Sequence, residues 1–379
     1  MGLRFSSRFH WDLRPNRLTQ ALAARRAAGA PVLDLTESNP TRAALDYPPG
    51  ILRAFEDPRI LAYDPSPAGA LDAREAVAAY YAARGTHVAP ARILLTASTS
   101  EAYAYLFKLL CDPGDEVLVP RPSYPLFEFL ADMESVKVRQ YSLAYHGGWS
   151  LELPEVTDRT RAIILVNPNN PTGSYVKRSE LAALATLCAD RDIALISDEV
   201  FADYALTADP ERVTTLAGVE SCAAFCMSGL SKVAGLPQMK LGWIVANRAG
   251  AIERLEWIAD TYLSVGTPVQ CAASRLLAAG DAVQRQIRER TAANLAFARN
   301  AVAGSAGNIL AVEGGWYMTL QMPRVRTEEE WTLELLQRDS VLVQPGFFFD
   351  FEAEAFLVIS LLTPSGTFCD GINRIKAWL

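Results

Sequence analysis

The sequence has few of the residues that build metal and disulfide sites. Its 379 residues include 3 histidines and 6 cysteines. The cysteines are scattered, none belongs to a CxxC pair, and the closest two are Cys222 and Cys226. Because no second pair or histidine cluster accompanies them, the pattern argues against a zinc site. We expect unpaired thiols in a reducing cytoplasm.

The chain also lacks a long hydrophobic run and an excess of basic residues. Its longest apolar stretches, such as FLVISLL at 356–362, have the length of a strand. A membrane-spanning helix needs about 20 apolar residues. The N-terminal stretch has no apolar segment of signal-peptide length. The formal net charge of −7 argues against nucleic acid or an anionic membrane as the main partner. We therefore expect a cytoplasmic protein with neither kind of partner.

What the middle of the chain does have is a regular alternation of strands and helices. Short apolar runs of strand length alternate with amphipathic stretches such as SEAYAYLFKLL and KRSELAALATLCADRD. Runs that are apolar throughout are typical of strands covered on both faces. The pattern predicts an α/β domain with a large, mostly parallel, seven-stranded sheet flanked by helices. The predicted strands include 92–96, 116–120, 161–166, 193–197, 223–227 and 241–246.

The last hundred residues have a different pattern. Three further strand-like runs, at 314–322, 341–346 and 355–362, surround a helical stretch. They predict a smaller α+β domain, against which we expect the N-terminal helix RLTQALAARRAAG to pack. No long linker separates the parts. The predicted division gives residues 46–270 to the large domain, and residues 1–45 and 271–379 to the small one.

In open α/β sheets, ligands bind at the carboxyl ends of the strands, and polar residues follow several of the predicted strands here. Thr99 and Ser100 open a helix, where hydroxyls and backbone N–H groups can hold an anion such as phosphate. Tyr124 follows a proline turn and could stack on a flat ring. Taken alone, Thr99 and Ser100 are explained equally well as an ordinary helix cap, and Tyr124 as an aromatic side chain that packs in the core.

Three more polar side chains follow the next strands. Asn170 lies in the turn NPNNPTG, and Asp198 comes directly after the apolar run IALIS. Lys232 is surrounded by small residues in SGLSKVAG, which let a bulky polar group approach the backbone. Together, the groups at this sheet edge suit an aromatic aldehyde phosphate. A lysine can form a Schiff base with the aldehyde, and a carboxylate can pair with a ring nitrogen.

With these motifs in order, the chain resembles the fold-type I pyridoxal-phosphate aminotransferases of class I/II. The motifs are NNPTG, SDEVF and GLSK, with Asp198 and Lys232 separated by 34 positions. The resemblance extends over nearly the whole chain. It implies the cofactor pyridoxal 5′-phosphate (PLP) and a homodimer with shared active sites. Lys232 would carry the cofactor and move the Cα proton, and Asp198 would bind the pyridine nitrogen.

The resemblance implies further contacts to the cofactor. Asn170 would bind the ring hydroxyl and Tyr124 would stack on the ring. The phosphate would be held by Thr99, Ser100 and Ser231, and by Tyr63 of the neighbouring subunit. Thr267 would line the same subunit boundary.

The sequence departs from the family pattern at four places. Phe201 stands where the family usually has a tyrosine, and Lys240 stands where it usually has an arginine that grips the phosphate. A lysine is a point charge without the arginine fork. Ser38 and Asn39 replace a glycine-containing substrate segment. Val358 occupies the position of the arginine for the substrate carboxylate, and Arg42 is the sequence candidate for its replacement.

The leading interpretation is an aminotransferase that moves an α-amino group between an amino acid and a 2-oxo acid by a ping-pong mechanism. The alternative is a PLP-dependent lyase or synthase that acts at Cα or Cβ on the same fold. A ligand sensor with an aminotransferase-like domain is a third reading. It would carry an N-terminal helix-turn-helix domain, and about 30 residues before LDLTESNPT are too few for one.

Overall fold

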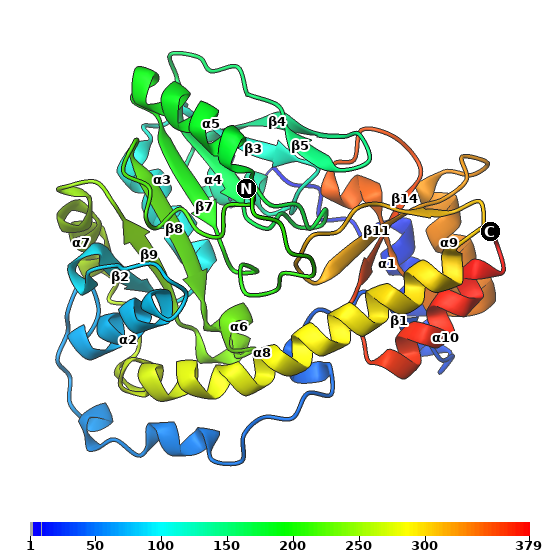
Figure 1. Ribbon diagram of the computed structural model, residues 1–379, viewed down its shortest axis with the longest axis horizontal. Helices are drawn as coiled ribbons and strands as arrows, with labels where there is room; N and C mark the ends of the chain where they lie inside the picture. The colour runs from blue at the N-terminus through cyan, green and yellow to red at the C-terminus, as the bar shows by residue number, and fades with distance from the viewer. Residues whose placement is uncertain (1–2, 9) are drawn as a thin grey trace.

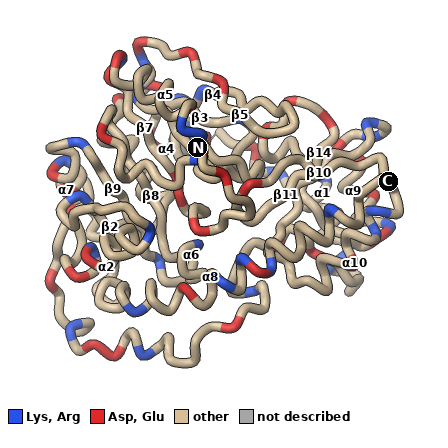
Figure 2. The backbone as a smooth tube through the Cα atoms, viewed as in Figure 1, with Lys and Arg blue, Asp and Glu red and all other residues tan. Residues whose placement is uncertain are grey.

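The computed structural model describes residues 3–8 and 10–379. Two sheets lie on opposite sides of the molecule, and one long helix, α8 (Thr267–Val302), runs past both of them (Figure 1). The large sheet has eight strands and the smaller one has four. Acidic and basic residues are interspersed along the outer segments of both parts (Figure 2). Within the described residues, no helix is long and apolar enough to cross a membrane.

The large sheet confirms the predicted fold class but corrects the number of strands from seven to eight. Its order is β2-β9-β8-β7-β6-β3-β4-β5. The pairs among β3, β4, β6, β7 and β8 are parallel, whereas β9 and β5 pair antiparallel with their neighbours. The strands are β2 (Ile93–Thr96), β3 (Glu116–Arg121), β4 (Lys137–Tyr145), β5 (Trp149–Leu151), β6 (Thr160–Val166), β7 (Ala194–Asp198), β8 (Ala224–Gly229) and β9 (Gly242–Ala246).

Helices cover both faces of this sheet, which explains its uniformly apolar strands. Adjacent residues of one strand enter different cores: Ile163 and Leu195 belong to one cluster, and Ile164 and Ile196 belong to the other. The first cluster includes residues of α2 (Leu71–Ala82), α5 (Arg178–Arg191) and α8. The second includes residues of α3 (Thr99–Leu110), α4 (Phe127–Met133) and α7 (Ala251–Tyr262).

The smaller part is built as the sequence predicts, from the tail of the chain and its N-terminal helix. Its sheet has the order β10-β11-β14-β13, and a second pair joins β1 to β12. Arg25 of the N-terminal helix donates a hydrogen bond to the carbonyl of Gln337 in α9 over 2.9 Å. The elements are α1 (Arg17–Ala27), β1 (Leu33–Asp34), β10 (Asn308–Ile309), β11 (Tyr317–Gln321), α9 (Glu328–Asp339), β12 (Val341–Leu342), β13 (Gln344–Pro345), β14 (Phe356–Ser360) and α10 (Ser365–Lys376).

Helix α8 is shared by the two parts. Its first turns contribute Val269 and Leu276 to a core of the large sheet, and its last turns contribute Leu295 and Val302 to the core of the small one. The predicted boundary at residue 270 falls within this continuous helix, so the division into domains stays a prediction. Midway along α8, a Cβ atom on Gly280 would lie 2.8 Å from the Cβ of Ala234, so only glycine fits there without a shift.

Candidate active site

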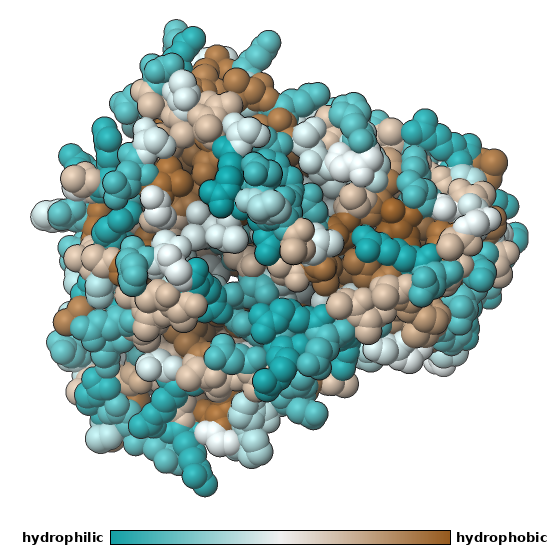
Figure 3. Space-filling view, viewed as in Figure 1, coloured by the Kyte–Doolittle hydropathy of each residue, from teal (hydrophilic) through white to brown (hydrophobic). Residues whose placement is uncertain are grey.

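A cavity of about 290 Å³ lies at the carboxyl ends of the central strands. Its lining includes Val166 at the end of β6, Asp198 at the end of β7 and Gly229 at the end of β8. The space-filling view shows the surface hollowed between the large-sheet part and α8 (Figure 3). Because parallel strands end at one edge, residues that are far apart in the sequence converge here.

Most of the predicted site residues line this one cavity, and three do not. Asn39 and Arg42 lie outside its lining, and Arg42 is exposed. Tyr63 is 82% exposed and lines a separate cavity together with Thr267. The predicted residues that line the first cavity are Ser38, Thr99, Ser100, Tyr124, Asn170, Asp198, Ser231, Lys232 and Lys240.

Lys232 lies on the short helix α6 (Leu230–Val233), which begins directly after β8. The hydroxyl of Tyr204 donates to the backbone carbonyl of Lys232 over 2.5 Å, and Gln284 of α8 donates to the next carbonyl, that of Val233. Burial lowers the pKa of the Lys232 amine to about 8, and the nearby Asp198 acts in the opposite direction. A buried amine on a fixed backbone is suited to act as a nucleophile and a base.

Aromatic rings surround the tip of Lys232. Its Nζ atom lies 5.0 Å from the ring centre of Trp316 and 5.8 Å from that of Phe201. Trp316 also meets the rings of Phe201 and Tyr204 edge-on, with centres 5.2 and 5.1 Å apart. Phe201, where the sequence resemblance leads one to expect a tyrosine, is thus part of an aromatic cluster. The hydroxyl of Tyr204 already donates its hydrogen bond to the backbone carbonyl of Lys232.

Asp198 lines the cavity at the end of β7. Its Oδ1 accepts a hydrogen bond from the backbone N–H of Val200 over 3.2 Å, and its Oδ2 accepts one from the hydroxyl of Tyr103 over 3.2 Å. Burial raises the pKa of Asp198 to about 6, and these hydrogen bonds and the charge of Lys232 act in the opposite direction. The carboxylate therefore stays mainly ionised at neutral pH, ready for a cationic partner.

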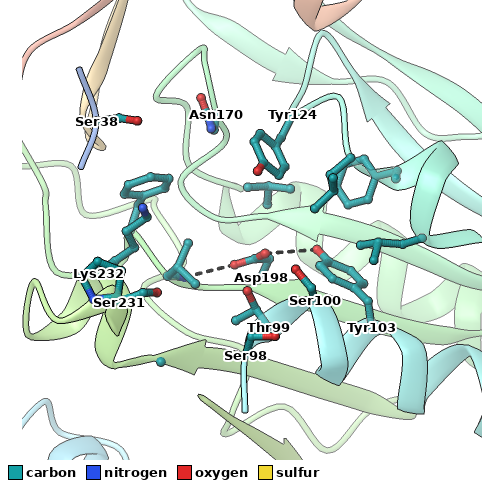
Figure 4. A pocket seen from close by; sticks show the side chains of 18 of the residues that line it. Ser38, Ser98, Thr99, Ser100, Tyr103, Tyr124, Asn170, Asp198, Ser231 and Lys232 are labelled. Atoms are coloured by element: carbon teal, nitrogen blue, oxygen red, sulfur yellow. Dashed lines mark hydrogen bonds between the residues drawn. The ribbon is translucent and has the colours of Figure 1, made fainter. Parts of the chain in front are cut away.

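Tyr103 is a site residue that the sequence reasoning missed. It lies on α3 four positions after Thr99, so the two residues share a helix face. That spacing was a signal that could have placed Tyr103 beside the helix end that is predicted to bind phosphate. Its hydroxyl contacts Asp198 from the side opposite Lys232 (Figure 4).

One end of the cavity is suited to an anion. The side chain of Ser98 caps α3 by accepting from the backbone N–H of Glu101 over 3.1 Å. The first turn of a helix leaves N–H groups without intrahelical partners, and the helix dipole favours negative charge there. In the close view, Ser98, Thr99 and Ser100 lie on one side of Asp198, and Ser38, Asn170 and Tyr124 lie on the other (Figure 4).

The lining fits PLP group by group. The cavity offers an amine for the aldehyde, a carboxylate for the ring nitrogen and a helix N-terminus with hydroxyls for the phosphate. Asn170 adds an amide whose buried Oδ1 has no hydrogen-bond partner within the described residues. An unsatisfied buried acceptor at a cavity wall is expected where a ligand supplies a donor. The Nδ2 group of the same amide is the donor that suits the ring oxygen. The fold and this cavity together define a fold-type I PLP-binding protein.

Comparison with known proteins gives the family. The model of the family described as aminotransferase class I and II matches residues 30–367, so the chain belongs to this family. Members of the family use PLP. Two solved structures share the fold over nearly all of both chains. An aminotransferase from Escherichia coli has a TM-score of 0.86 at 23% identity, covering 100% of this chain and 98% of that one. Alanine aminotransferase from Pyrococcus furiosus has a TM-score of 0.87 at 22% identity, covering 99% of each.

Relatives by sequence include two kinds of transaminase. The glutamate-pyruvate aminotransferase AlaA of Escherichia coli is 30% identical over 256 residues, which are 64% of this chain and 63% of that enzyme's length. The tyrosine aminotransferase of Bos taurus is 25% identical over 350 residues, which are 85% of this chain and 75% of that enzyme.

Proposed function

We propose that this chain is a PLP-dependent aminotransferase that moves an α-amino group between an amino acid and a 2-oxo acid in two half-reactions. The observation that carries the proposal is the placement of Lys232 and Asp198 in one cavity with a helix N-terminus suited to phosphate. The names of the relatives, glutamate-pyruvate and tyrosine aminotransferase, support this reaction type.

In the proposed mechanism, Lys232 holds the cofactor and later moves the proton at the substrate's Cα. When bound, the protonated pyridine ring supplies an electron sink for this proton transfer. Asp198 keeps the ring nitrogen protonated through its charge. Tyr124 would cover the ring face, and the side-chain N–H of Asn170 would donate to the ring oxygen.

The phosphate contacts are part of the same proposal. Thr99, Ser100 and Ser231 would donate hydroxyl hydrogen bonds, and the first turn of α3 would donate backbone N–H groups. Lys240 would add a positive charge without the two-point geometry of an arginine. These residues share the cavity lining with Lys232.

The test is to follow the amino group through one half-reaction. The purified protein, loaded with PLP, is mixed with single amino acids, and the cofactor is released with acid and separated by chromatography. We expect conversion to pyridoxamine phosphate, and its return to PLP on addition of a 2-oxo acid. Consumption of the amino acid with the cofactor recovered only as PLP would contradict transamination and favour the lyase or synthase alternative.

We also propose that the protein is a homodimer with shared sites. Tyr63 is far more exposed than tyrosines usually are, and it lies with Thr267 at a cavity separate from that of Lys232. A two-fold interface would bring Tyr63 of one subunit to the phosphate of the other. Mixed Tyr63→Phe and Lys232→Ala subunits should then regain one intact site per heterodimer. A fully active monomer in sedimentation would contradict this assembly.

A cytoplasmic location completes the proposal. Its support is the six cysteines, which are all free. Unpaired thiols are typical of a reducing compartment. Fractionation of cells that produce the full-length protein should place it with cytoplasmic markers, and recovery with an extracytoplasmic marker would contradict the proposal.

A further inference from the structure

One face of the small sheet looks toward the cavity. On it, Tyr317 of β11 pairs with Ser360 of β14, and Thr319 pairs with Val358. Paired residues and residues two positions apart point to the same side of a sheet. Tyr317 lines the cavity that contains Lys232. The intervening residues of both strands enter the small core on the other side: Met318, Leu320, Leu357 and Ile359.

The position expected to hold an arginine lies on this face but carries no charge. Val358 is fully buried beside Thr319. Within the described residues, the cations that line the cavity are Lys232 and Lys240, and the proposed function gives both to the cofactor. Arg42 is exposed and lies outside the lining. A substrate carboxylate in this cavity therefore needs other donors, because burying it unpaired is costly.

The cavity offers a pair of hydroxyls at this place, those of Tyr317 and Ser38. Burial raises the pKa of Tyr317 to about 12, against a hydrogen bond with Ser38 that lowers it. The phenol therefore keeps its proton at neutral pH and can donate it to an anion. A hydroxyl that donates to a carboxylate makes a stronger hydrogen bond than one between neutral groups.

The segment that carries Ser38 is fixed against β14. The backbone N–H of Ser360 donates to the carbonyl of Leu35 over 2.8 Å, and the hydroxyl of Ser360 donates to the carbonyl of Glu37 over 2.7 Å. Ser38 therefore follows a segment that is tied to the same strand that pairs with Tyr317. The backbone beside Ser38 is thus anchored before any substrate arrives, and its hydroxyl is already hydrogen-bonded to that of Tyr317, which lowers the cost of ordering the pair.

We propose that the hydroxyls of Tyr317 and Ser38 bind the carboxylate of the amino acid and of the 2-oxo acid. They would take the role of the expected arginine, whose position is occupied by Val358. This inference rests on the proposed function and names the residues that select its substrates. It makes Tyr317 a specificity-determining residue for the carboxylate rather than for the substrate's side chain.

The test is Tyr317→Phe in the PLP-loaded protein, because phenylalanine keeps the ring and removes only the donor. We expect KM for the best amino acid and for its 2-oxo acid to rise about 10- to 100-fold, the range for a lost hydrogen bond to a charged group. The absorbance spectrum of the bound cofactor should not change. KM for the corresponding amine, with hydrogen in place of the carboxylate, should stay within about twofold of the wild-type value.

Thr319→Val is the matched control. Thr319 lies on the same strand and face, is 1% exposed and is outside the cavity lining. This variant should keep the wild-type KM values. An unchanged KM in Tyr317→Phe would overturn the inference. An equal rise of KM for the carboxylate-free amine would also overturn it, because the hydroxyl would then act on something other than the carboxylate.

A binding measurement separates this inference from the proposed function. Calorimetry can compare an unreactive carboxylate, 3-phenylpropanoate, with 3-phenylpropanol in the PLP-loaded protein. We expect Tyr317→Phe to weaken the carboxylate about 10-fold or more and to leave the alcohol unchanged. Equal effects on both ligands would overturn the inference. If no amino acid converts the cofactor in the wild type, the proposed function fails while this comparison still tests the subsite.

Discussion

The ε-amino nitrogen of Lys232 lies 5.0 Å from the centre of the Trp316 ring. The face of an indole attracts a cation, most strongly where water is excluded. Burial disfavours the charged form of the Lys232 amine. The attraction of the Trp316 ring for a cation offsets part of this desolvation cost. The charged and titratable groups that share the cavity with this amine are Asp198, Lys240, Tyr103, Tyr124 and Tyr317.

The first prediction concerns the pH dependence of cofactor attachment. Only the neutral amine attacks an aldehyde, and the pKa of Lys232 is lowered to about 8. In cofactor-free protein, the rate of covalent attachment of PLP should rise with pH and level off above about 8. A free lysine derivative should keep rising toward its ordinary pKa of about 10.4. If the attachment rate of the protein depended on pH in the same way as that of the free lysine derivative, the lowered pKa of Lys232 would be contradicted.

The second prediction concerns Trp316. Phenylalanine at this position keeps a buried ring but offers a weaker cation site. Trp316→Phe should therefore lower the midpoint of the attachment profile by roughly half a unit. Trp257→Phe is the control, because Trp257 is 81% exposed on α7. A midpoint that is unchanged, or that moves upward, would show that the ring does not stabilise the ammonium form.

The third prediction identifies the attachment point. Reduction of the loaded protein with borohydride should trap the cofactor on Lys232, as shown by peptide mapping. Lys232→Ala should abolish the label, whereas Lys240→Ala should bind PLP more weakly but keep the label on Lys232. Both lysines line the cavity, so the pair of variants separates the nucleophile from the charge. A label on any other lysine would refute the core of the proposed function.

The fourth prediction separates Asp198 from its neighbour Tyr103. Asp198→Ala should keep the reducible attachment to Lys232 but lower kcat by on the order of 100-fold, because the ring nitrogen loses its charge partner. Tyr103→Phe removes one hydrogen bond to the carboxylate and should cost only about 10-fold or less. Single-turnover absorbance measures both. Near-normal turnover in Asp198→Ala would be incompatible with its assigned role.

The fifth prediction concerns the contact between α8 and α6. Gly280→Ala places a Cβ 2.8 Å from that of Ala234 and 2.9 Å from its Cα, where backbone cannot yield easily. It should lower the free energy of unfolding by about 1–2 kcal/mol despite the better helix propensity of alanine. Denaturant titration measures this. Adding Ala234→Gly should restore only part of the loss, because the Cα atom of residue 234 stays 2.9 Å from the new Cβ.

Gly366→Ala is the control for that prediction. Gly366 lies in α10 and has no atom within 4 Å of its added Cβ, so this variant should be at least as stable as the wild type. Equal losses in both glycine variants would indicate that helix packing against α6 is not the cause.

The sequence predicted the central part of the site because that part depends on strand ends. Asn170, Asp198 and Lys232 each follow an apolar run, and such residues converge wherever the strands are parallel. The same reasoning misses β4, which is partly exposed and therefore not uniformly apolar. It also misses β5, which has only three residues. Local pattern shows neither strand. The ranges given from the sequence therefore cover six of the eight strands, and the predicted count of seven was one short.

The substrate end could not be predicted in the same way. Tyr317 reaches the cavity only because the small sheet packs beside the large one, and its partner Ser38 comes from the opposite end of the chain. No spacing in the sequence joins these two residues. Whether Tyr63 acts at a neighbouring site depends on how a second copy of the chain packs against the first. A single sequence does not specify which residues of the two copies meet.

The continuous helix α8 makes the two ends of the cavity mechanically dependent on each other. Its last turns are embedded in the core behind Tyr317, while Gln284 in its middle holds the carbonyl next to Lys232. Because α8 is one continuous helix, a tilt at its C-terminal end also moves the turns in its middle. A movement of the small sheet that brings Tyr317 closer to a substrate would therefore also shift the backbone of the segment that carries Lys232.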